Sequence, residues 1–237
     1  MIHQYADVSS FAEQLLVHEH AVVKVRPDMP LDRASLIGCA VTTGLGAVFR
    51  TAAVAPGETV AVIGCGGVGL SAIQGARIAG ASRIVAIDIA TPKLEMAARF
   101  GATDLVDASV GDAAEQVMEI TYGGVDHAFD AIGRPTTPPQ AFAMLRPGGT
   151  ATIIGMIPLG ATIELPGVDF LAEKRIQGSC MGSNQFRTDA PRFVDFYFDG
   201  RLDLDSLISN RMPLDRVNDA MAALDGGALA RTILMFD

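Results

Sequence analysis

The stretch Thr59-Val-Ala-Val-Ile-Gly-Cys-Gly-Gly-Val-Gly69 indicates the fold class of this chain. An apolar strand runs directly into the pattern Gly64-x-Gly66-x-x-Gly69. In such a unit Gly64 makes the tight turn, Gly66 lets a pyrophosphate approach the backbone, and Gly69 allows the following helix to pack closely on the sheet. The helix begins near Gly66, so its free N–H groups and positive dipole end face the phosphates.

A second apolar run, Arg83-Ile-Val-Ala-Ile-Asp88, ends in an acid that lies 19 residues after Gly69. This is close to the roughly 20 residues expected for a carboxylate that binds an adenosine ribose. Strand, glycine turn, helix and acid together predict a dinucleotide site; the alternative is a glycine-rich turn in another α/β protein. Asp88 can accept both ribose hydroxyls and repels a 2′-phosphate, and Ile89 follows it in place of an arginine, so NAD is favoured over NADP. Lys93 could reach the same ribose from the next helix.

Strands and helices are predicted to alternate from about residue 41 to residue 183. Thr91 and Pro92 are typical of an N-cap and a first-turn proline. The remaining segments are a helix to residue 100, a strand at 104–106, a helix at 109–121, a strand at 125–130, a helix to 144, a turn at 147–149 and a strand at 150–155. This alternation predicts an α/β fold with a doubly wound parallel sheet of the Rossmann type.

The two flanks have a different pattern, which divides the chain into residues 1–40, 41–183 and 184–237. The first flank contains a strand-like run at 21–25. The last contains two predicted helices, 191–198 and about 214–224, and a final strand at 231–236.

The bulk composition limits the possible partners. The chain has 237 residues, of which 49% are hydrophobic, and a net charge of −9, which argues against nucleic acid and fits small-molecule partners. No apolar run approaches the ~20 residues of a membrane span, and the start lacks the pattern of a secretion signal. The three cysteines are far apart and odd in number, which favours a reducing cytoplasm over a disulfide framework.

Four motifs resemble one family: Leu36-Ile-Gly-Cys-Ala-Val-Thr-Thr-Gly44, Val62-Ile-Gly-Cys-Gly-Gly-Val-Gly69, Phe129-Asp-Ala-Ile-Gly133 and Arg231-Thr-Ile-Leu234. The chain resembles the zinc-dependent medium-chain alcohol dehydrogenases, closest to the class with the liver-type and glutathione-dependent formaldehyde-oxidising enzymes. The likeness covers essentially the whole chain, in order. It implies a Rossmann sheet with remnants of a GroES-like catalytic domain at both ends, 1–40 and 184–237, and without the N-terminal part of that domain.

The resemblance implies an incomplete zinc site. Cys39 matches the last of three catalytic-zinc ligands, and the other two have no counterpart, nor do the structural-zinc cysteines or the proton relay. No catalytic residue is therefore assigned. Without partners Cys39 is expected to be a buried thiol. His18 and His20 could share a metal if they lay on one strand face, although an outer position is favoured, and His127 is expected to be a hydrogen-bonded structural residue.

The resemblance also implies a set of cofactor contacts. Gly64, Gly66 and Gly69 would form the pyrophosphate turn with amides around Gly67 and Val68, and Val68 would pack behind the nicotinamide. The other expected contacts are Asp88 and Lys93 at the adenosine ribose, Ile132 beside the adenine, Thr43, Ile154 and Met156 near the nicotinamide, and Arg231 at the pyrophosphate. Met156 and Cys180 match positions near the substrate pocket.

Three functional hypotheses follow from these observations. The first is an NAD-dependent oxidoreductase of alcohols or aldehydes, present as a truncated chain with an intact cofactor domain. The second is a non-catalytic NAD(H)-binding or interaction module, because uncovered apolar faces in both flanks would seek partners. A zinc-free reductase is a weaker third hypothesis, because the Gly38-Cys39 motif resembles that of the zinc-dependent liver-type enzymes. The family pairs subunits through the last strands of the sheet, here about residues 150–183, so a homodimer is expected.

Overall fold

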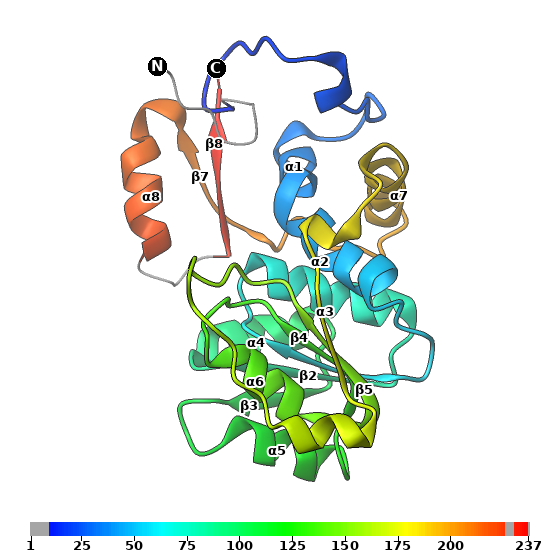
Figure 1. Ribbon diagram of the computed structural model, residues 1–237. Coiled ribbons are helices and arrows are strands. Elements are labelled where there is room, and N and C mark those ends of the chain that lie inside the picture. Colours follow the sequence, from blue (N-terminus) through cyan, green and yellow to red (C-terminus); the bar gives the residue numbers. More distant parts are fainter. Residues whose placement is uncertain (1–9, 226–229, 237) are drawn as a thin grey trace.

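The computed structural model describes residues 10–225 and 230–236. Six parallel strands form the central sheet in the order β3-β2-β1-β4-β5-β6 (Figure 1). Their bounds are β1 Thr59–Ile63, β2 Arg83–Asp88, β3 Asp104–Asp107, β4 Val125–Asp130, β5 Leu145–Ile153 and β6 Arg175–Gly178. The chain order reverses between β1 and β4, which makes the carboxyl ends of these two strands the switch point where ligands of such sheets bind.

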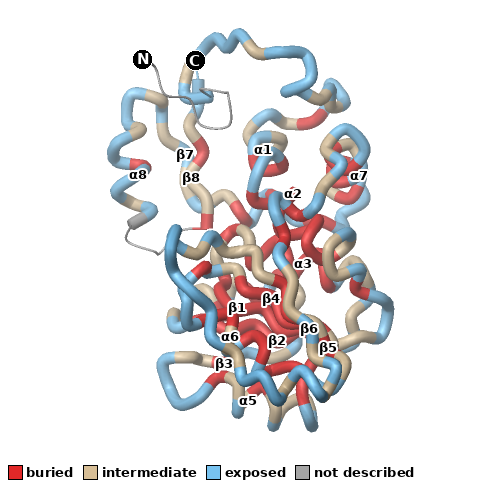
Figure 2. The backbone as a smooth tube through the Cα atoms, in the orientation of Figure 1, coloured by how far each residue is buried: buried red, intermediate tan, exposed pale blue. Residues whose placement is uncertain are grey.

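The sheet is buried on both faces because apolar residues occupy both sides of each central strand (Figure 2). Val60 and Val62 of β1 point to a core shared with α3 (Gly67–Ala79) and α4 (Thr91–Phe100). Ala61 and Ile63 point to a second core shared with α5 (Ala113–Ile120) and α6 (Thr137–Ala143). Helices therefore cover both faces, and the predicted doubly wound parallel sheet is confirmed.

A continuous helical segment, Leu31–Thr51, packs against α3 and will be called the 31–51 helix. It consists of α1 (Leu31–Leu36), a wider π turn (Ile37–Val41), α2 (Thr42–Gly46) and a second π turn (Ala47–Thr51). It has 21 residues, and its most apolar 18-residue window has a mean hydropathy of 1.3. By length and composition alone it could span a membrane, which corrects the expectation that no segment approaches this length. Its most apolar window is 61% buried inside the protein, as in a core helix.

The C-terminal part of the chain lies beside the 31–51 helix, with its first helix on one side and its two strands and last helix on the other (Figure 1). It contains α7 (Phe186–Phe198), β7 (Ile208–Pro213), a 3-10 turn (Leu214–Arg216), α8 (Val217–Asp225) and β8 (Arg231–Met235), with β7 and β8 paired in parallel. Buried Gln74 of α3 fixes the connection between α7 and β7, because its amide binds both the carbonyl (3.0 Å) and the N–H (2.7 Å) of Asp203. Further 3-10 turns lie at Glu19–Ala21, Gly167–Ala172 and Met181–Ser183.

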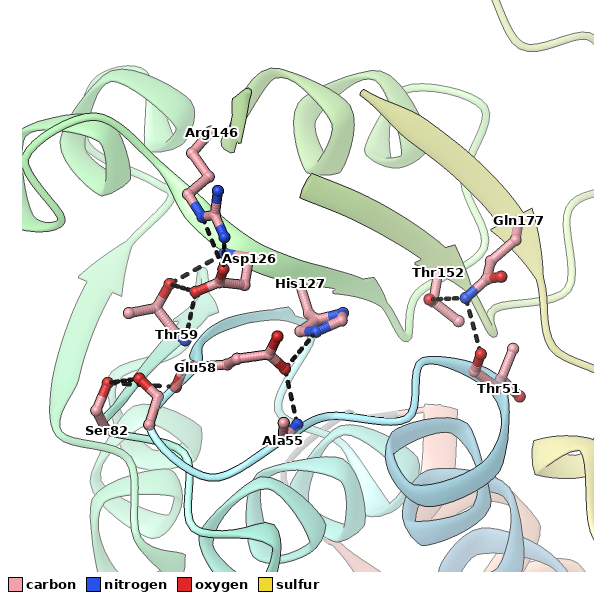
Figure 3. Close-up of polar contacts among 11 residues, drawn as sticks. Thr51, Ala55, Glu58, Thr59, Ser82, Asp126, His127, Arg146, Thr152 and Gln177 are labelled. Carbon is pink, nitrogen blue, oxygen red and sulfur yellow. Dashed lines mark hydrogen bonds and ion pairs between the residues drawn. The ribbon is translucent and has the colours of Figure 1, made fainter. Parts of the chain in front are cut away.

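Polar side chains tie the amino ends of β1 and β4 together (Figure 3). Asp126 accepts hydrogen bonds from the Thr59 N–H (2.8 Å) and hydroxyl (2.7 Å) and pairs with Arg146. His127 Nε2 lies 2.8 Å from Glu58 Oε2, which confirms His127 as a hydrogen-bonded structural residue. These contacts occupy the edge of the sheet opposite the glycine turn.

The first four strands of the sheet lie where the sequence predicts them. The fifth was predicted at 150–155 after a turn at 147–149, but β5 already begins at Leu145 and includes that turn, and β6 was not predicted. Several helix boundaries and one further element were also wrong. Residues 21–25 form no strand: a 3-10 turn ends at Ala21, and no described strand pairs with the extended chain after it. Thr91 is not the N-cap of α4, because the helix already starts there and Ala90 caps it. The predicted helix 109–121 begins only at Ala113, after Asp112, whose carboxylate accepts the Ala114 N–H at 2.7 Å.

The helix predicted from residue 191 begins earlier, at Phe186, with Pro191 inside it. Asp189 stabilises this start, since its carboxylate accepts the Gln185 N–H at 2.7 Å. Arg50 binds the same carboxylate through two hydrogen bonds of 2.6 Å, which joins α7 to the 31–51 helix. Burial alone would raise the pKa of Asp189, but the bonds from Arg50 and Gln185 outweigh it and lower that pKa.

The Asp189→Asn variant should have a lower free energy of unfolding at neutral pH than the parent, and this free energy should change less as the pH falls. A depressed folded-state pKa means that the contribution of Asp189 is complete above about pH 4 to 5 and is lost as the pH falls through that pKa. Removing the charge also leaves Arg50 without its partner, so the free energy of unfolding at pH 7 should fall by about 2–4 kcal/mol. Urea unfolding at pH 7 and pH 3.5 measures both effects.

The Asp219→Asn variant is the control, because the one ion pair of Asp219 among the described residues is exposed and joins α8 to Arg216 of the preceding 3-10 turn. It should change the free energy of unfolding little at either pH. If the free energy of unfolding fell equally between pH 7 and pH 3.5 in the Asp189→Asn variant and the parent, the role given to Asp189 would be contradicted.

Candidate functional site

The glycine turn joins β1 to α3 at the switch point. Gly64 has φ +94°, a left-handed conformation that favours glycine, and the side chain of Ile132 lies against it. A Cβ on Gly69 would collide with the Gly64 carbonyl oxygen, so only glycine permits this approach of helix to turn. Gly66 is the N-cap of α3 without a side-chain cap, and the space beside its Cα is open. The turn is therefore a cradle at a helix N-terminus, suited to an anion.

Asp88 ends β2 beside this turn and is 8% exposed. Its Oδ2 accepts the Cys65 N–H at 2.8 Å, and its Oδ1 accepts the Ala90 N–H at 3.1 Å. An ionised carboxylate has about four acceptor positions, so these bonds leave capacity for a hydroxyl-bearing ligand. Lys93, on the first turn of α4, is half-buried.

Arg231 reaches the glycine turn from β8. Its guanidinium lies so close to Gly67 that a Cβ there would collide with it. Among the described residues it forms no ion pair, and its one hydrogen bond is donated by Nη1 to the Ala230 carbonyl at 2.7 Å. Burial lowers the pKa of Arg231, and the nearby Cys39 thiol only partly opposes this effect. Arg231 is half-buried, and a partly desolvated cation without a counter-charge is costly, so an anion between Arg231 and the turn would be stabilising.

A cavity of about 780 Å³ opens next to Arg231. Cys39 of the 31–51 helix, Met181, and the apolar side chains of α8 and β8 line it, among them Val217, Met221 and Ile233. Its wall is mostly apolar, and Arg231 is its charged group. Apolar walls with a few placed polar groups are typical of small-molecule sites.

Ile132, Ile154 and Met156 lie at the carboxyl ends of β4 and β5. The Asp130 carboxylate accepts the Ile132 N–H at 2.9 Å and so fixes the turn that holds Ile132 beside Gly64. Met156 is 85% exposed, whereas Ile154 is half-buried and packs on the core. The sequence-predicted cofactor residues thus gather around one edge of the sheet.

The residues present do not fit a zinc site. Within the part of the chain that the structure describes, no group of three or more histidine, cysteine or acidic side chains could hold a metal. The rings of His18 and His20 lie 4.7 Å apart, but the His18 Nδ1 already accepts the His20 N–H. Cys39 is exposed, which corrects the expectation of a buried thiol: it lines the cavity instead of facing the sheet.

Two features of the site were not predicted. Met181 lines the cavity, and Thr43, which is buried, lies with its hydroxyl 3.7 Å from the Met181 sulfur. Met181 and Ser183 also have left-handed backbones, which cost roughly 1–2 kcal/mol each outside glycine. The sequence predicted neither the handedness of this turn nor its place against the 31–51 helix.

Comparisons with known proteins agree with this geometry. Residues 67–197 match the family model described as zinc-binding dehydrogenase. The chain is 40% identical to a probable S-(hydroxymethyl)glutathione dehydrogenase of Schizosaccharomyces pombe, over 97% of this chain and 61% of the relative. It is 36% identical to a class-3 alcohol dehydrogenase of Cereibacter sphaeroides, over 98% of this chain and 64% of the relative.

Solved structures give the same result. An alcohol dehydrogenase zinc-binding domain protein from Burkholderia ambifaria superposes with a TM-score of 0.95 at 34% identity, covering 98% of this chain and 62% of that one. Benzyl alcohol dehydrogenase from Acinetobacter calcoaceticus superposes with a TM-score of 0.94 at 32% identity, covering 97% and 64%. The chain therefore spans less than two thirds of these relatives, 61% to 64% of their length. With a family model that matches more than half of it, the chain belongs to the zinc-binding dehydrogenase family.

Proposed function

We propose that this chain binds NAD(H) across the carboxyl edge of its sheet. The observation that carries the proposal is the half-buried Arg231 guanidinium, which lies over Gly67 at the N-terminus of α3 without a carboxylate partner among the described residues. Two phosphates between that cation and the free N–H groups of the helix would satisfy both. Residues 41–183 would then form the cofactor domain, with 1–40 and 184–237 as parts of a second domain.

The two halves of the cofactor would lie on either side of this phosphate position. Asp88 and Lys93 would hold the adenosine ribose, with Ile132 beside the adenine. Asp88 favours NAD over NADP because a buried carboxylate repels a 2′-phosphate. The nicotinamide half would extend past Val68 toward Thr43, Ile154 and Met156, at the side of the cavity.

The family assignment further supports an oxidoreductase that acts on a small alcohol or aldehyde. When bound, the nicotinamide ring takes up or gives hydride. The residues of this chain would bind and orient it, and the apolar cavity beside Arg231 would exclude water. Because the described residues do not fit a zinc site, we assign no residue of this chain to proton transfer or to activation of the alcohol oxygen.

A non-catalytic NAD(H)-binding module is the second candidate. It is favoured by the same missing ligand set, together with large apolar side chains exposed on the segment between β5 and β6. NADH binding without alcohol turnover would fit this candidate. A cytoplasmic location fits both this module and the oxidoreductase.

Replacing Arg231 by glutamine should weaken NADH binding by about ten- to a hundred-fold, because charge-assisted hydrogen bonds to phosphate are lost. Fluorescence titration of NADH with the purified chain measures this change, and NADPH in the parent should bind at least about ten-fold more weakly than NADH. The control is Arg216→Gln, which removes an exposed arginine of the 3-10 turn before α8. Equal NADH affinity in the parent and the Arg231→Gln variant would remove the main support for the proposal.

Purified, chelator-washed chain should contain well below one zinc per molecule and should oxidise ethanol or other primary alcohols little or not at all. Elemental analysis and a spectrophotometric NADH assay check the two statements. About one zinc per chain together with turnover would show that Cys39 has partners outside the ligand set considered above. The Cys39→Ser variant would then lose both.

The chain should form a homodimer through the β6 edge of its sheet. The outer side of β6 has no partner strand among the described residues, and Leu159, Val168 and Leu171 are exposed in the segment before it. Sedimentation equilibrium at micromolar concentration should give twice the mass of one chain. Leu171→Glu should shift the mass toward one chain, whereas Val110→Glu, next to the opposite edge strand β3, should not; a monomeric parent would contradict the proposal.

A further inference from the structure

The segment after β6 makes an unusual turn that leads to the cavity. Three consecutive residues have positive φ: Met181 (+49°), Gly182 (+69°) and Ser183 (+48°). Left-handed backbones are costly for methionine and serine, so a turn of this kind persists only where its surroundings hold it. Such strain concentrates at functional sites.

The turn is held first by direct packing on the 31–51 helix. A Cβ built on Gly182 would lie 2.8 Å from the Gly46 Cα and 2.8 Å from the Thr43 carbonyl oxygen. Gly46 is equally restricted, because a Cβ there would collide with Gly182. The two backbones are therefore in contact through a pair of glycines.

Three hydroxyl groups form a second set of contacts that hold the turn. The Thr51 hydroxyl, at the end of the 31–51 helix, lies 2.8 Å from the Ser179 hydroxyl and 2.8 Å from the Ser183 hydroxyl. These serines stand on either side of Met181, so Thr51 closes the turn from both ends. We call Thr51, Ser179 and Ser183 the hydroxyl lock. Gln177 supports it, since its amide nitrogen donates to the Thr51 carbonyl and to the Thr152 hydroxyl at 3.1 Å each (Figure 3).

The held turn fixes one wall of the cavity. Met181 lines the cavity together with Cys39 and Arg231, and its sulfur lies 3.7 Å from the Thr43 hydroxyl. Arg231 marks the phosphate position over Gly67, and Asp88 lies on the adenosine side of it. A dinucleotide that crosses the switch point from Asp88 must place its other half toward β4, β5 and this cavity.

We infer that the hydroxyl lock is a positioning device for the nicotinamide half of the cofactor. It acts through Met181 and the backbone of the turn and does not touch the ligand itself. Without the lock, the strained turn would populate other conformations, and part of the binding free energy would go into restoring it. The inference rests on the proposed NAD(H) function and deepens it, by separating what holds the nicotinamide end from what holds the phosphates and adenosine.

The test compares two ligands: NADH, and ADP-ribose, which lacks the nicotinamide ring. Thr51→Val removes the hydroxyl and keeps the branched shape, and Thr51→Ser keeps the hydroxyl. Thr51→Val should weaken NADH binding by about three- to ten-fold, the size of one or two lost hydrogen bonds, with ADP-ribose affinity within about two-fold of the parent. Thr51→Ser should restore NADH affinity, and Ser183→Ala should resemble Thr51→Val.

Calorimetric titration of both ligands gives the ratio of their affinities, and ADP-ribose binding also reports whether each variant is folded. Ser82→Ala is the matched control, because that hydroxyl bonds the Gly57 carbonyl at 2.6 Å at the opposite edge of the sheet. The inference would be overturned if Thr51→Val left the ratio of the two affinities unchanged, either because neither ligand lost affinity or because both lost it equally. ADP-ribose binding as tight as NADH in the parent would also overturn it, whereas a parent that binds neither ligand would overturn the proposed function as well.

Discussion

The close approach of α3 to the end of β1 is the constraint on which the rest of the molecule depends. Gly69 lies against the Gly64 carbonyl, so the helix starts directly above the turn and its N–H groups open toward the switch point. The same helix packs on the 31–51 helix, where Gly44 faces Ser71 and Ala72 at distances that leave no room for a Cβ. Its Gln74 amide then anchors the C-terminal part of the chain at Asp203. One helix thus positions the proposed phosphate cradle, the helix that carries Cys39 and the part of the chain that carries Arg231.

The parts of the fold that the sequence predicted are those determined by local pattern. The runs 59–63 and 83–88 are mostly apolar, the run 125–130 is half apolar, all three are short and followed by turn residues, and each forms a strand of the sheet. The acid that ends β2 could be located because the helix between the two strands has a nearly standard length. These features need no knowledge of distant residues, so a single sequence is enough to predict them.

The parts that were wrong or missed depend on contacts between distant segments. Residues 21–25 have the valine-rich composition of a strand, but a strand needs a partner and none of the described strands pairs with them. The early start of α7 depends on Arg50, which lies far away in the chain and pairs with Asp189. Likewise, the exposure of Cys39 and the handedness of the turn at Met181 follow from how the 31–51 helix is packed. No periodicity in the sequence encodes these arrangements.

The origin of Arg231 has a consequence for the order in which the molecule folds. The proposed phosphate cradle lies in the first third of the chain, at residues 64–69, but the cation proposed to complete it comes from the last described strand. Contacts between such distant segments form slowly, because a long loop must close before they can contribute. The sheet can therefore form before the anion site is complete, and tight cofactor binding would mark the end of folding of the whole chain. A nascent or C-terminally clipped molecule would keep the Rossmann architecture but lack its strongest attachment to phosphate.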